Sequence, residues 1–413
     1  MSKLHKYAFS DLYDMTSGIS STKEQAGHGA PFVSFSTVFN NYFLPDELTD
    51  LMDTSEREQE TYSIRKGDIL ITRTSETVDE LAMSCVALKD YPKATYSGFV
   101  KRLRPKTTGI AYDKYMGFFL RSKYFRKVIN SNTIMTLRAS FNEDIFSFLT
   151  LYLPDYEEQV KIGDMLYYLE KKIQINKKIN DNLQQMTKII YDYWFTQFDF
   201  PNKDGKPYRS SGGSMMWDDN LKKEIPQGWA SGQLSDIANI TMGQSPEGST
   251  YNEEQNGTVF FQGCTDFGNR FPEPRVYTTA PTRFAKAGDI LMSVRAPVGT
   301  LNVALENCCI GRGLAALNSK YGSQLHLMYT LVMFKRLFNI MDSNGTTFGS
   351  ITKDELYEMK VVIPPAEQME AFERTVQPIE QKIKQCELEN RELTRQRNWL
   401  LPMLMNGQAT VSD

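Results

Sequence analysis

Two long stretches of the chain share one pattern of largely apolar positions. In residues 154–197 the positions recur at alternating steps of four and three: Ile162, Leu166, Leu169, Ile173, Asn176, Asn180, Leu183, Thr187, Ile190 and Trp194. In residues 364–406 the same steps visit Phe372, Val376, Ile379, Ile383, Cys386, Asn390, Leu393, Arg397, Leu400 and Leu404. An average step of about 3.5 residues keeps one stripe facing a partner helix in a coiled coil. The pattern therefore predicts two long helices that pack through these stripes.

The two stretches correspond residue for residue at a constant offset of 210, so that Pro154 matches Pro364 and Asn180 matches Asn390. A buried Asn lowers stability but penalises shifted registers, because its amide then faces an apolar hole. One amphipathic helix could show such a pattern by chance. Two copies in phase indicate an internal duplication.

Each predicted helix follows a β-rich region, residues 1–153 and residues 217–363. Short apolar runs bounded by turn residues predict strands in both, and Gly67-Asp-Ile-Leu in the first region reappears as Gly288-Asp-Ile-Leu in the second. A helix is expected over about 113–129. The Gly- and Pro-containing segment 198–216 is predicted to be a linker.

The order is therefore domain, helix, domain, helix. Because sequential elements usually neighbour one another, the helices are expected to run antiparallel. The predicted fold class is α+β, with two β-rich globular domains in pseudo-twofold repeat separated by two long helices packed as an antiparallel coiled coil. Pro378 predicts that the second helix kinks or begins afresh there.

Composition describes a globular protein of 413 residues, 41% hydrophobic and 23% charged, with a net charge of -3. Basic residues gather in 93–127, where Asp113 is the single acid, which favours a basic binding face. Five cysteines without a Cys-x-x-Cys pair suggest neither a disulfide framework nor a zinc site. No apolar run approaches the roughly 18 residues of a membrane span. A cytoplasmic protein is expected.

The sequence shows no recognisable catalytic motif. Asp155 and Glu170 match a loose nuclease string, but 15 residues of helix would separate them by about 22 Å. Carboxylates that share a Mg²⁺ ion place their oxygens about 2.1 Å from it. There is no phosphate-binding P-loop motif and no amino-methyltransferase tetrad, and Gly311-Arg-Gly313 is interpreted as a turn. The chain alone is not expected to be an enzyme or to bind a metal.

Polar and basic side chains in the two domains suit base edges and phosphates. In the first domain the DNA-binding candidates are Arg65, Lys66, Arg73, Thr74, Ser75, Lys101, Arg102, Arg104 and Arg138. In the second they are Gln244, Ser245, Tyr251, Gln262, Arg270, Arg275, Arg283, Arg295, Arg312, Thr347 and Ser350.

The chain resembles, over essentially its whole length, the specificity subunit of type I restriction–modification systems. The duplicated Gly-Asp-Ile-Leu and the two long helices carry the resemblance, together with Gly243-Gln-Ser-Pro, Gly288-Asp-Ile-Leu-Met-Ser-Val-Arg-Ala-Pro and Gly345-Thr-Thr-Phe-Gly-Ser. It implies two target-recognition domains that each read half of a bipartite, asymmetric DNA site. It also implies that the helices set the spacer and dock two methyltransferase subunits, and that two motor–nuclease subunits join the full complex.

The same resemblance implies no cofactor in this chain, with S-adenosylmethionine, ATP and Mg²⁺ on the partner subunits. Apolar residues of the first helix that lie off its stripe are predicted to bind partners: Ile175, Ile179, Met186, Ile189 and Tyr193. The alternative is a coiled-coil adaptor whose end domains bind proteins rather than DNA.

Overall fold

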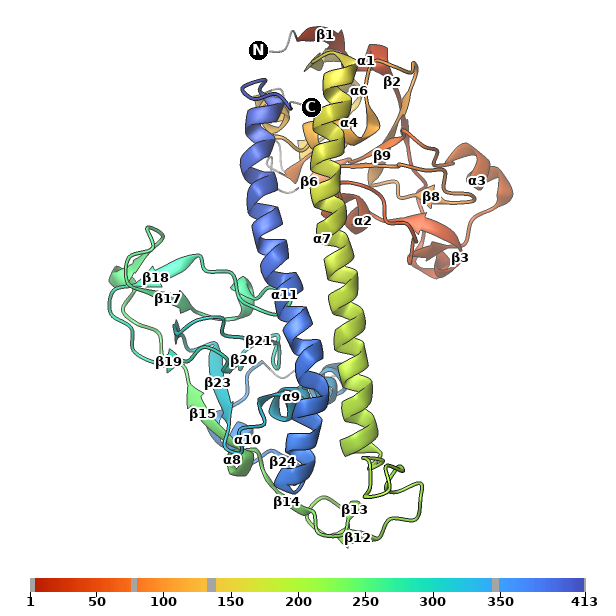
Figure 1. The fold of residues 1–413 in the computed structure, drawn as a ribbon. Coiled ribbons are helices and arrows are strands. Elements are labelled where there is room, and N and C mark those ends of the chain that lie inside the picture. The colour runs from red at the N-terminus through yellow and green to blue at the C-terminus, as the bar shows by residue number, and fades with distance from the viewer. Residues whose placement is uncertain (1–3, 76–79, 132–138, 344–348, 412–413) are drawn as a thin grey trace. The chain divides into compact units, whose positions relative to one another are not determined.

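The computed structural model describes residues 4–75, 80–131, 139–343 and 349–411 (Figure 1). The chain divides into two compact units. Unit 1 consists of Met1–Gln174 and Arg391–Asp413, and unit 2 consists of Ile175–Asn390. Each unit therefore combines one globular body with one half of each long helix.

The body of unit 1 contains a four-stranded antiparallel sheet in the order β2-β9-β5-β7. Its strands are β2 (Tyr13–Ser17), β9 (Val100–Pro105), β5 (Ile69–Thr72) and β7 (Ser84–Val86). A three-stranded sheet, β4-β3-β8, comprises β4 (Leu51–Met52), β3 (Ala26–Val33) and β8 (Thr95–Tyr96). Two strand pairs complete the body, β1 (His5–Ala8) with β11 (Thr150–Leu153) and β6 (Thr74–Ser75) with β10 (Ala139–Ser140).

The helices of this body are short: α1 (Phe9–Leu12), α2 (Phe35–Asn40), α3 (Glu56–Thr61), α4 (Asp113–Phe119), α5 (Lys123–Ser131) and α6 (Glu143–Phe148). The single helix expected over 113–129 is thus two helices. Buried side chains of α4 and α5 share one core with β5 and β9, including Phe118, Phe125 and Leu103.

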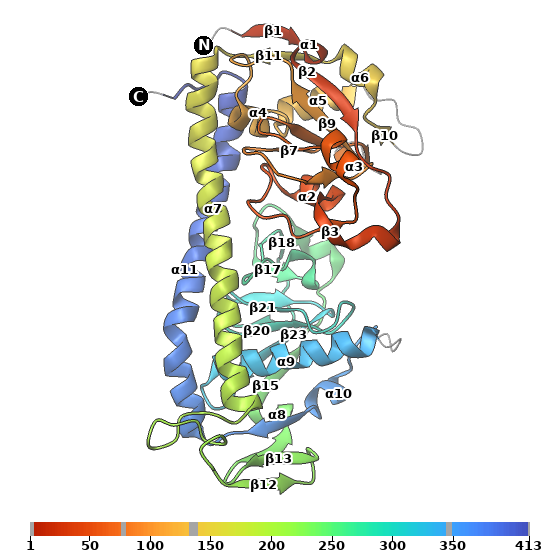
Figure 2. The same ribbon diagram turned by 90° about the vertical axis from the view of Figure 1, so that its right-hand side faces the viewer.

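The body of unit 2 contains a four-stranded sheet in the order β15-β23-β20-β21. Its strands are β15 (Ala238–Met242), β23 (Leu314–Ser319), β20 (Ile290–Ser293) and β21 (Leu301–Val303). A five-stranded sheet, β16-β18-β17-β22-β19, comprises β16 (Tyr251–Asn252), β18 (Val276–Thr278), β17 (Thr258–Phe261), β22 (Cys308–Ile310) and β19 (Phe284–Ala285). The body also contains the pair β14 (Ala230–Gln233) with β24 (Lys360–Ile363) and the helices α8 (Leu234–Ile237), α9 (Gln324–Ser343) and α10 (Lys353–Tyr357), and α9 lies beside the four-stranded sheet (Figure 2).

The predicted duplication is confirmed at the level of strand order. Each body begins with the same succession of a strand, a short helix and the first strand of the four-stranded sheet: β1-α1-β2 in unit 1 and β14-α8-β15 in unit 2. The four-stranded sheets have equivalent orders, whereas the second sheet has three strands in unit 1 and five in unit 2. The scaffold therefore repeats, and the two bodies differ in the second sheet.

The repeated Gly-Asp-Ile-Leu is a turn that starts a central strand. Asp68 accepts the backbone N–H of Arg65 at 2.7 Å, and Asp289 accepts that of Lys286 at 2.8 Å. The glycine before each aspartate has a left-handed backbone, with φ +86 at Gly67 and +91 at Gly288. Because a side chain is strained in that conformation, glycine is favoured at both positions. The motif therefore has a structural role, since it turns the chain into a central strand of each four-stranded sheet.

The two predicted long helices are present as α7 (Tyr156–Tyr191), which continues into a π-helical turn over Asp192–Thr196, and α11 (Ala366–Met405). α11 does not begin afresh at Pro378. Pro378 is exposed, so the carbonyl that loses its helical partner there can be hydrated.

Contacts in unit 2 show its halves of the two helices running antiparallel. In unit 2, Asn176 donates to Asn390 at 3.0 Å, and Asn180 donates to Glu387 at 2.6 Å, so residue numbers rise in opposite directions. In unit 1, Arg397 of α11 pairs with Glu170 of α7. Both Asn180 and Asn390 are buried, as the stripes predict, but each finds a different partner on the facing helix.

The segment predicted as a linker, 198–216, is folded against unit 2. Phe198 and Phe200 are buried, and their rings lie 5.5 and 5.0 Å from that of Trp229. A hairpin of β12 (Met215–Asp218) and β13 (Lys223–Pro226) follows. Segment 198–216 is predicted to be a linker because its glycines and prolines are typical of turns. The few aromatic residues that anchor it give a weaker signal in the sequence.

Candidate nucleic-acid interface

Three basic candidates of unit 1, Lys101, Arg102 and Arg104, make contacts within the protein that stabilise its fold. Lys101 and Arg102 are 5% and 6% exposed. Lys101 bonds Ser17 at 2.9 Å and pairs with Glu143 at 3.3 Å, while Arg102 donates to a backbone carbonyl. Burial lowers the pKa of Arg102, since desolvation penalises its charge. These contacts offset part of the cost of burying the two charges, while Arg102 Nε finds no hydrogen-bond partner within the described residues.

Arg104 pairs with the buried carboxylate of Asp68 at 2.7 Å, and this hydrogen bond raises the pKa of Arg104. The side chains of Arg65, Lys66 and Arg73 are exposed. Thr74 and Ser75 form β6, and Arg138 lies outside the described residues. Among the unit 1 candidates, Arg65, Lys66 and Arg73 thus keep basic groups available to a ligand.

The arginines of unit 2 fall into two classes. Arg270 is 6% exposed and pairs with Glu380 of α11, which also accepts from the Tyr329 hydroxyl at 3.1 Å. Arg275 pairs with Asp266 at 2.9 Å. Arg283, Arg295 and Arg312 are exposed, and none of them takes part in an ion pair within the described residues.

Four predicted residues come together where three loops of unit 2 meet, a site we call the three-loop junction: Gln244, Ser245, Gln262 and Arg312. The Ser245 hydroxyl donates to Gln262 Oε1 at 3.0 Å and accepts the Arg312 backbone N–H at 3.2 Å. Gln244, Gln262 and Arg312 are exposed. Sequence reasoning chose these residues singly, and their proximity depends on the pairing of distant strands.

The remaining DNA-binding candidates of unit 2 are not part of the three-loop junction. Tyr251 donates its hydroxyl to the Pro246 carbonyl at 2.9 Å, and its ring packs 4.8 Å from that of Phe260. Arg295 forms a β-bridge with Ser350. Thr347 lies outside the described residues. Thr282, which was not predicted, donates its hydroxyl to the Gln244 carbonyl and secures the first loop.

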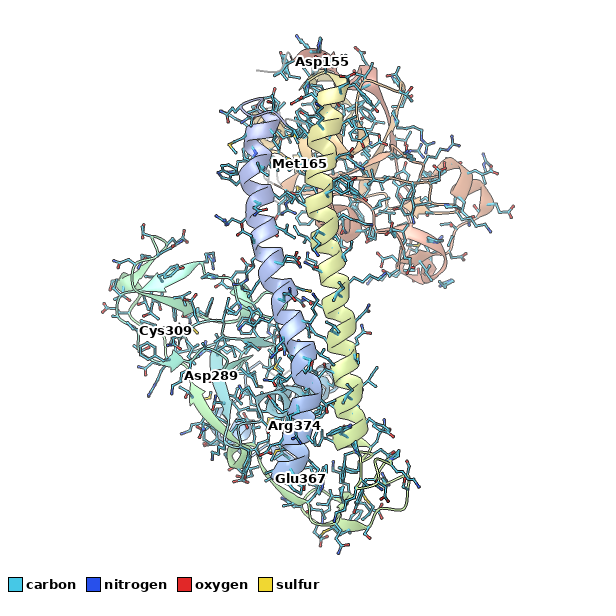
Figure 3. The ribbon with its side chains drawn as sticks, in the orientation of Figure 1. Asp155, Met165, Asp289, Cys309, Glu367 and Arg374 are labelled. Carbon is cyan, nitrogen blue, oxygen red and sulfur yellow. The ribbon has the colours of Figure 1, made fainter. Side chains whose placement is uncertain are left out.

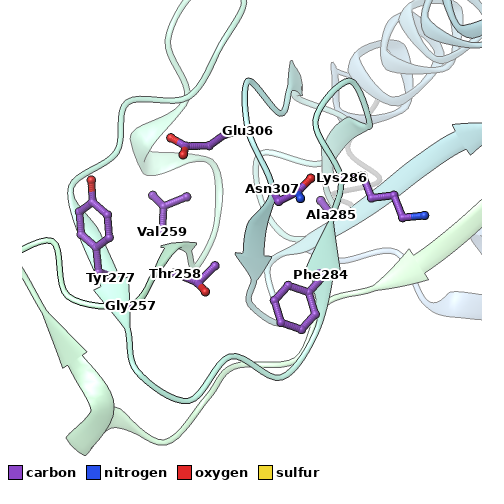
Figure 4. A pocket seen from close by; sticks show the side chains of 9 residues that line it. All are labelled: Gly257, Thr258, Val259, Tyr277, Phe284, Ala285, Lys286, Glu306 and Asn307. Carbon is purple, nitrogen blue, oxygen red and sulfur yellow. The ribbon is translucent and has the colours of Figure 1, made fainter.

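A hollow of about 470 Å³ opens beside β17 and β19 (Figure 4). Its lining includes Tyr277, Phe284, Lys286 and Glu306. Phe284 is 52% exposed, so the lining includes an aromatic ring that is open to solvent. None of the predicted DNA-binding residues lines it.

The predicted partner-binding residues form an exposed stripe on α7. Met186 is 51% exposed and Ile189 67% exposed, Ile175 and Tyr193 are also exposed, and Ile179 is half-buried. At about 100° per residue, these positions share one face of the helix, away from the buried seam residues Asn176, Asn180 and Thr187. Apolar side chains gathered on one exposed face are typical of an interaction surface.

The nuclease string has no catalytic geometry. Asp155 lies at the start of α7 (Figure 3) and bonds His5 at 2.9 Å, whereas Glu170 is buried against Arg397. Within the described residues no group of three or more His, Cys, Asp or Glu side chains could hold a metal ion. Burial lowers the pKa of His326 to about 4, so this histidine is a neutral core residue at pH 7. No helix in the described part of the chain is long and apolar enough to cross a membrane.

The chain is similar to proteins of one family. The model of the type I restriction modification DNA specificity domain matches residues 6–185 and 226–394. A putative type I restriction enzyme MjaX specificity subunit of Methanocaldococcus jannaschii is 28% identical over 95% of this chain and 90% of its own length. The type I restriction enzyme HindI specificity subunit of Haemophilus influenzae is 23% identical over 91% of this chain and 94% of its own length.

A solved structure supports the fold. The type I restriction–modification S subunit from M. genitalium has a TM-score of 0.59 at 15% identity, covering 98% of this chain and 96% of that one. The family model matches one segment in each half of the chain, each containing a globular body and most of the helix that follows it. This protein therefore belongs to the family of type I restriction–modification DNA specificity subunits, which act without catalysing a reaction on their own.

Proposed function

We propose that the globular body of each unit reads one half of a bipartite, asymmetric DNA target. The observation that carries this proposal is the repeat of one four-stranded scaffold beside two different second sheets. Repeated scaffolds would hold two readers in equivalent ways. Different sheets and loops would let each globular body recognise a different DNA sequence.

The long helices set the spacer between the half-sites in this proposal and dock two methyltransferase subunits. Two motor–nuclease subunits complete the restriction complex, and the cytoplasm is its compartment. S-adenosylmethionine, ATP and Mg²⁺ are bound by those partner subunits. This chain contributes DNA-facing side chains and the exposed α7 stripe, and it holds no cofactor.

Duplex binding separates the DNA reader from the alternative, a coiled-coil adaptor. With its methyltransferase partner, the chain should bind a duplex carrying its methylation target at least about a hundredfold more tightly than one with either half scrambled, because each lost base pair costs about 1–3 kcal/mol. Affinity for both duplexes should fall as salt rises, since phosphate contacts release counterions. Competition binding at two salt concentrations measures this. Equal affinity for intact and scrambled duplexes would favour the adaptor.

Charge on the exposed stripe should disrupt assembly. The double variant Ile179→Glu/Met186→Glu is expected to reduce co-purification of the methyltransferase subunit at least about tenfold, because two carboxylates would be desolvated in the interface. Circular dichroism should show unchanged helix content. Lys177→Glu is the matched control, since this exposed position points away from the stripe at about 100° per residue. Full assembly of the double variant would exclude this face as the docking site.

A further inference from the structure

The three-loop junction of unit 2 is built on closely packed backbone. A Cβ atom on Gly243 would lie 2.1 Å from the Gly311 carbonyl oxygen, and one on Gly313 would lie 2.7 Å from the Gln262 carbonyl oxygen. Such separations exclude any larger residue unless the backbone moves. Arg312, between Gly311 and Gly313, is therefore held at a fixed position with its side chain exposed.

Unit 1 contains the same backbone junction. Gly18 occupies the place of Gly243, and a Cβ atom on it would lie 2.3 Å from the Ser97 carbonyl oxygen. Three hydrogen bonds match in pairs: Gly18 N to Val100 O with Gly243 N to Leu314 O, Ile19 N to Tyr96 O with Gln244 N to Ile310 O, and Ser97 N to Val33 O with Gly311 N to Phe261 O. The two junctions therefore share one main-chain arrangement.

The side chains on this shared arrangement differ. Where unit 2 has Gln244, Gln262 and Arg312, unit 1 has Ile19, Ser34 and Gly98. Next to Gly98, Phe99 is 63% exposed. A common backbone that carries different side chains suits two readers of different sequences. A purely structural junction would not require polar residues in one copy and apolar or small residues in the other.

Arg312 and Gln262 present hydrogen-bond donors to a ligand. Arg312 has no ion-pair partner within the described residues, unlike Arg270 and Arg275. Gln262 turns its Oε1 toward the Ser245 hydroxyl, which directs its amide N–H groups the other way. In the major groove, guanine offers two adjacent acceptors, N7 and O6, which match the arginine fork. Adenine and cytosine each present a donor there that would oppose it.

We propose that Arg312, assisted by Gln262, reads a guanine in the half-site recognised by unit 2. This assignment rests on the proposed function, because it names the base for a reader that the proposal places in this body. Arg312 selects the base through its two-pronged geometry, and its charge alone would not suffice. Ser245 positions both groups through its hydroxyl and acts as a positioning residue.

Methylome sequencing of cells that express the variants with the methyltransferase subunit tests this assignment. Arg312→Ala and Arg312→Lys should each relax one guanine position in one half-site and leave the other half unchanged. Arg312→Lys keeps the charge, so a phosphate contact predicts an unaltered motif for it. Lys222→Ala is the control, because this exposed cation of unit 2 pairs with Asp219 and is not one of the DNA-binding candidates. An unchanged motif in both Arg312 variants, with methylation retained, would overturn the proposal.

A second measurement covers variants that fail to assemble. Replacing that guanine with 7-deazaguanine removes the N7 acceptor, and the wild-type complex should then bind the duplex about tenfold more weakly. Unchanged wild-type affinity, or a unit 2 half-site without guanine, would also overturn the assignment. Exchange of the unit 2 body would still change one half-site in that case, so failure here is distinguishable from failure of modular reading.

Discussion

Replacing Arg270 with methionine is expected to destabilise unit 2 by about 3–5 kcal/mol, because it leaves the largely buried Glu380 carboxylate without its cation. The Arg270 and Glu380 side chains are only 7% and 12% exposed, so the carboxylate would be left largely desolvated without its cation. The Tyr329 hydroxyl would remain as a single donor to Glu380. Denaturant unfolding followed by tryptophan fluorescence measures the loss.

Arg275→Met is the matched control for this prediction. Like Arg270, Arg275 pairs with a carboxylate, that of Asp266, but the Arg275 side chain is 59% exposed. The free energy of unfolding should therefore fall by less than about 1 kcal/mol. The double variant Arg270→Met/Glu380→Gln should recover much of the stability, because no buried charge remains. A loss below about 1 kcal/mol for Arg270→Met would show that the pair does not stabilise the unit.

The ion pairs on the long helices show where sequence reasoning reaches its limit. Glu170 and Glu380 are equivalent at the offset of 210; the Glu170 side chain is 8% exposed and that of Glu380 12%. Arg397 of α11 neutralises the first, whereas Arg270 of the unit 2 body neutralises the second. The repeat predicts equivalent glutamates. It cannot predict non-equivalent partners, since these depend on how each body packs against its helices.

The helices themselves were predictable because a spacing near 3.5 residues is a local signal that long elements repeat many times. Arg270 and Lys101, by contrast, are predicted to bind DNA because their basic side chains suit base edges and phosphates. The structure buries both against carboxylates. Only tertiary contacts distinguish a committed cation from an available one such as Arg312.

Exchange of the unit 2 body should change half of the recognised sequence. Residues 238–350 run from the first strand of the four-stranded sheet to the residue that bridges Arg295. Replacing them with the equivalent segment of another specificity subunit keeps α7, α11 and the α8 turn. One half-site should become that of the donor, with a discrimination of at least about a hundredfold over the original. The other half-site and the spacer should stay the same.

Methylome sequencing of cells expressing the exchanged chain with its methyltransferase subunit is the direct measurement. Two separate readers predict a bipartite motif with one old half, one new half and the original number of unspecified bases between them. The unexchanged chain serves as the reference for both halves. A folded, active chain whose motif changed in both halves, or in neither, would contradict the account.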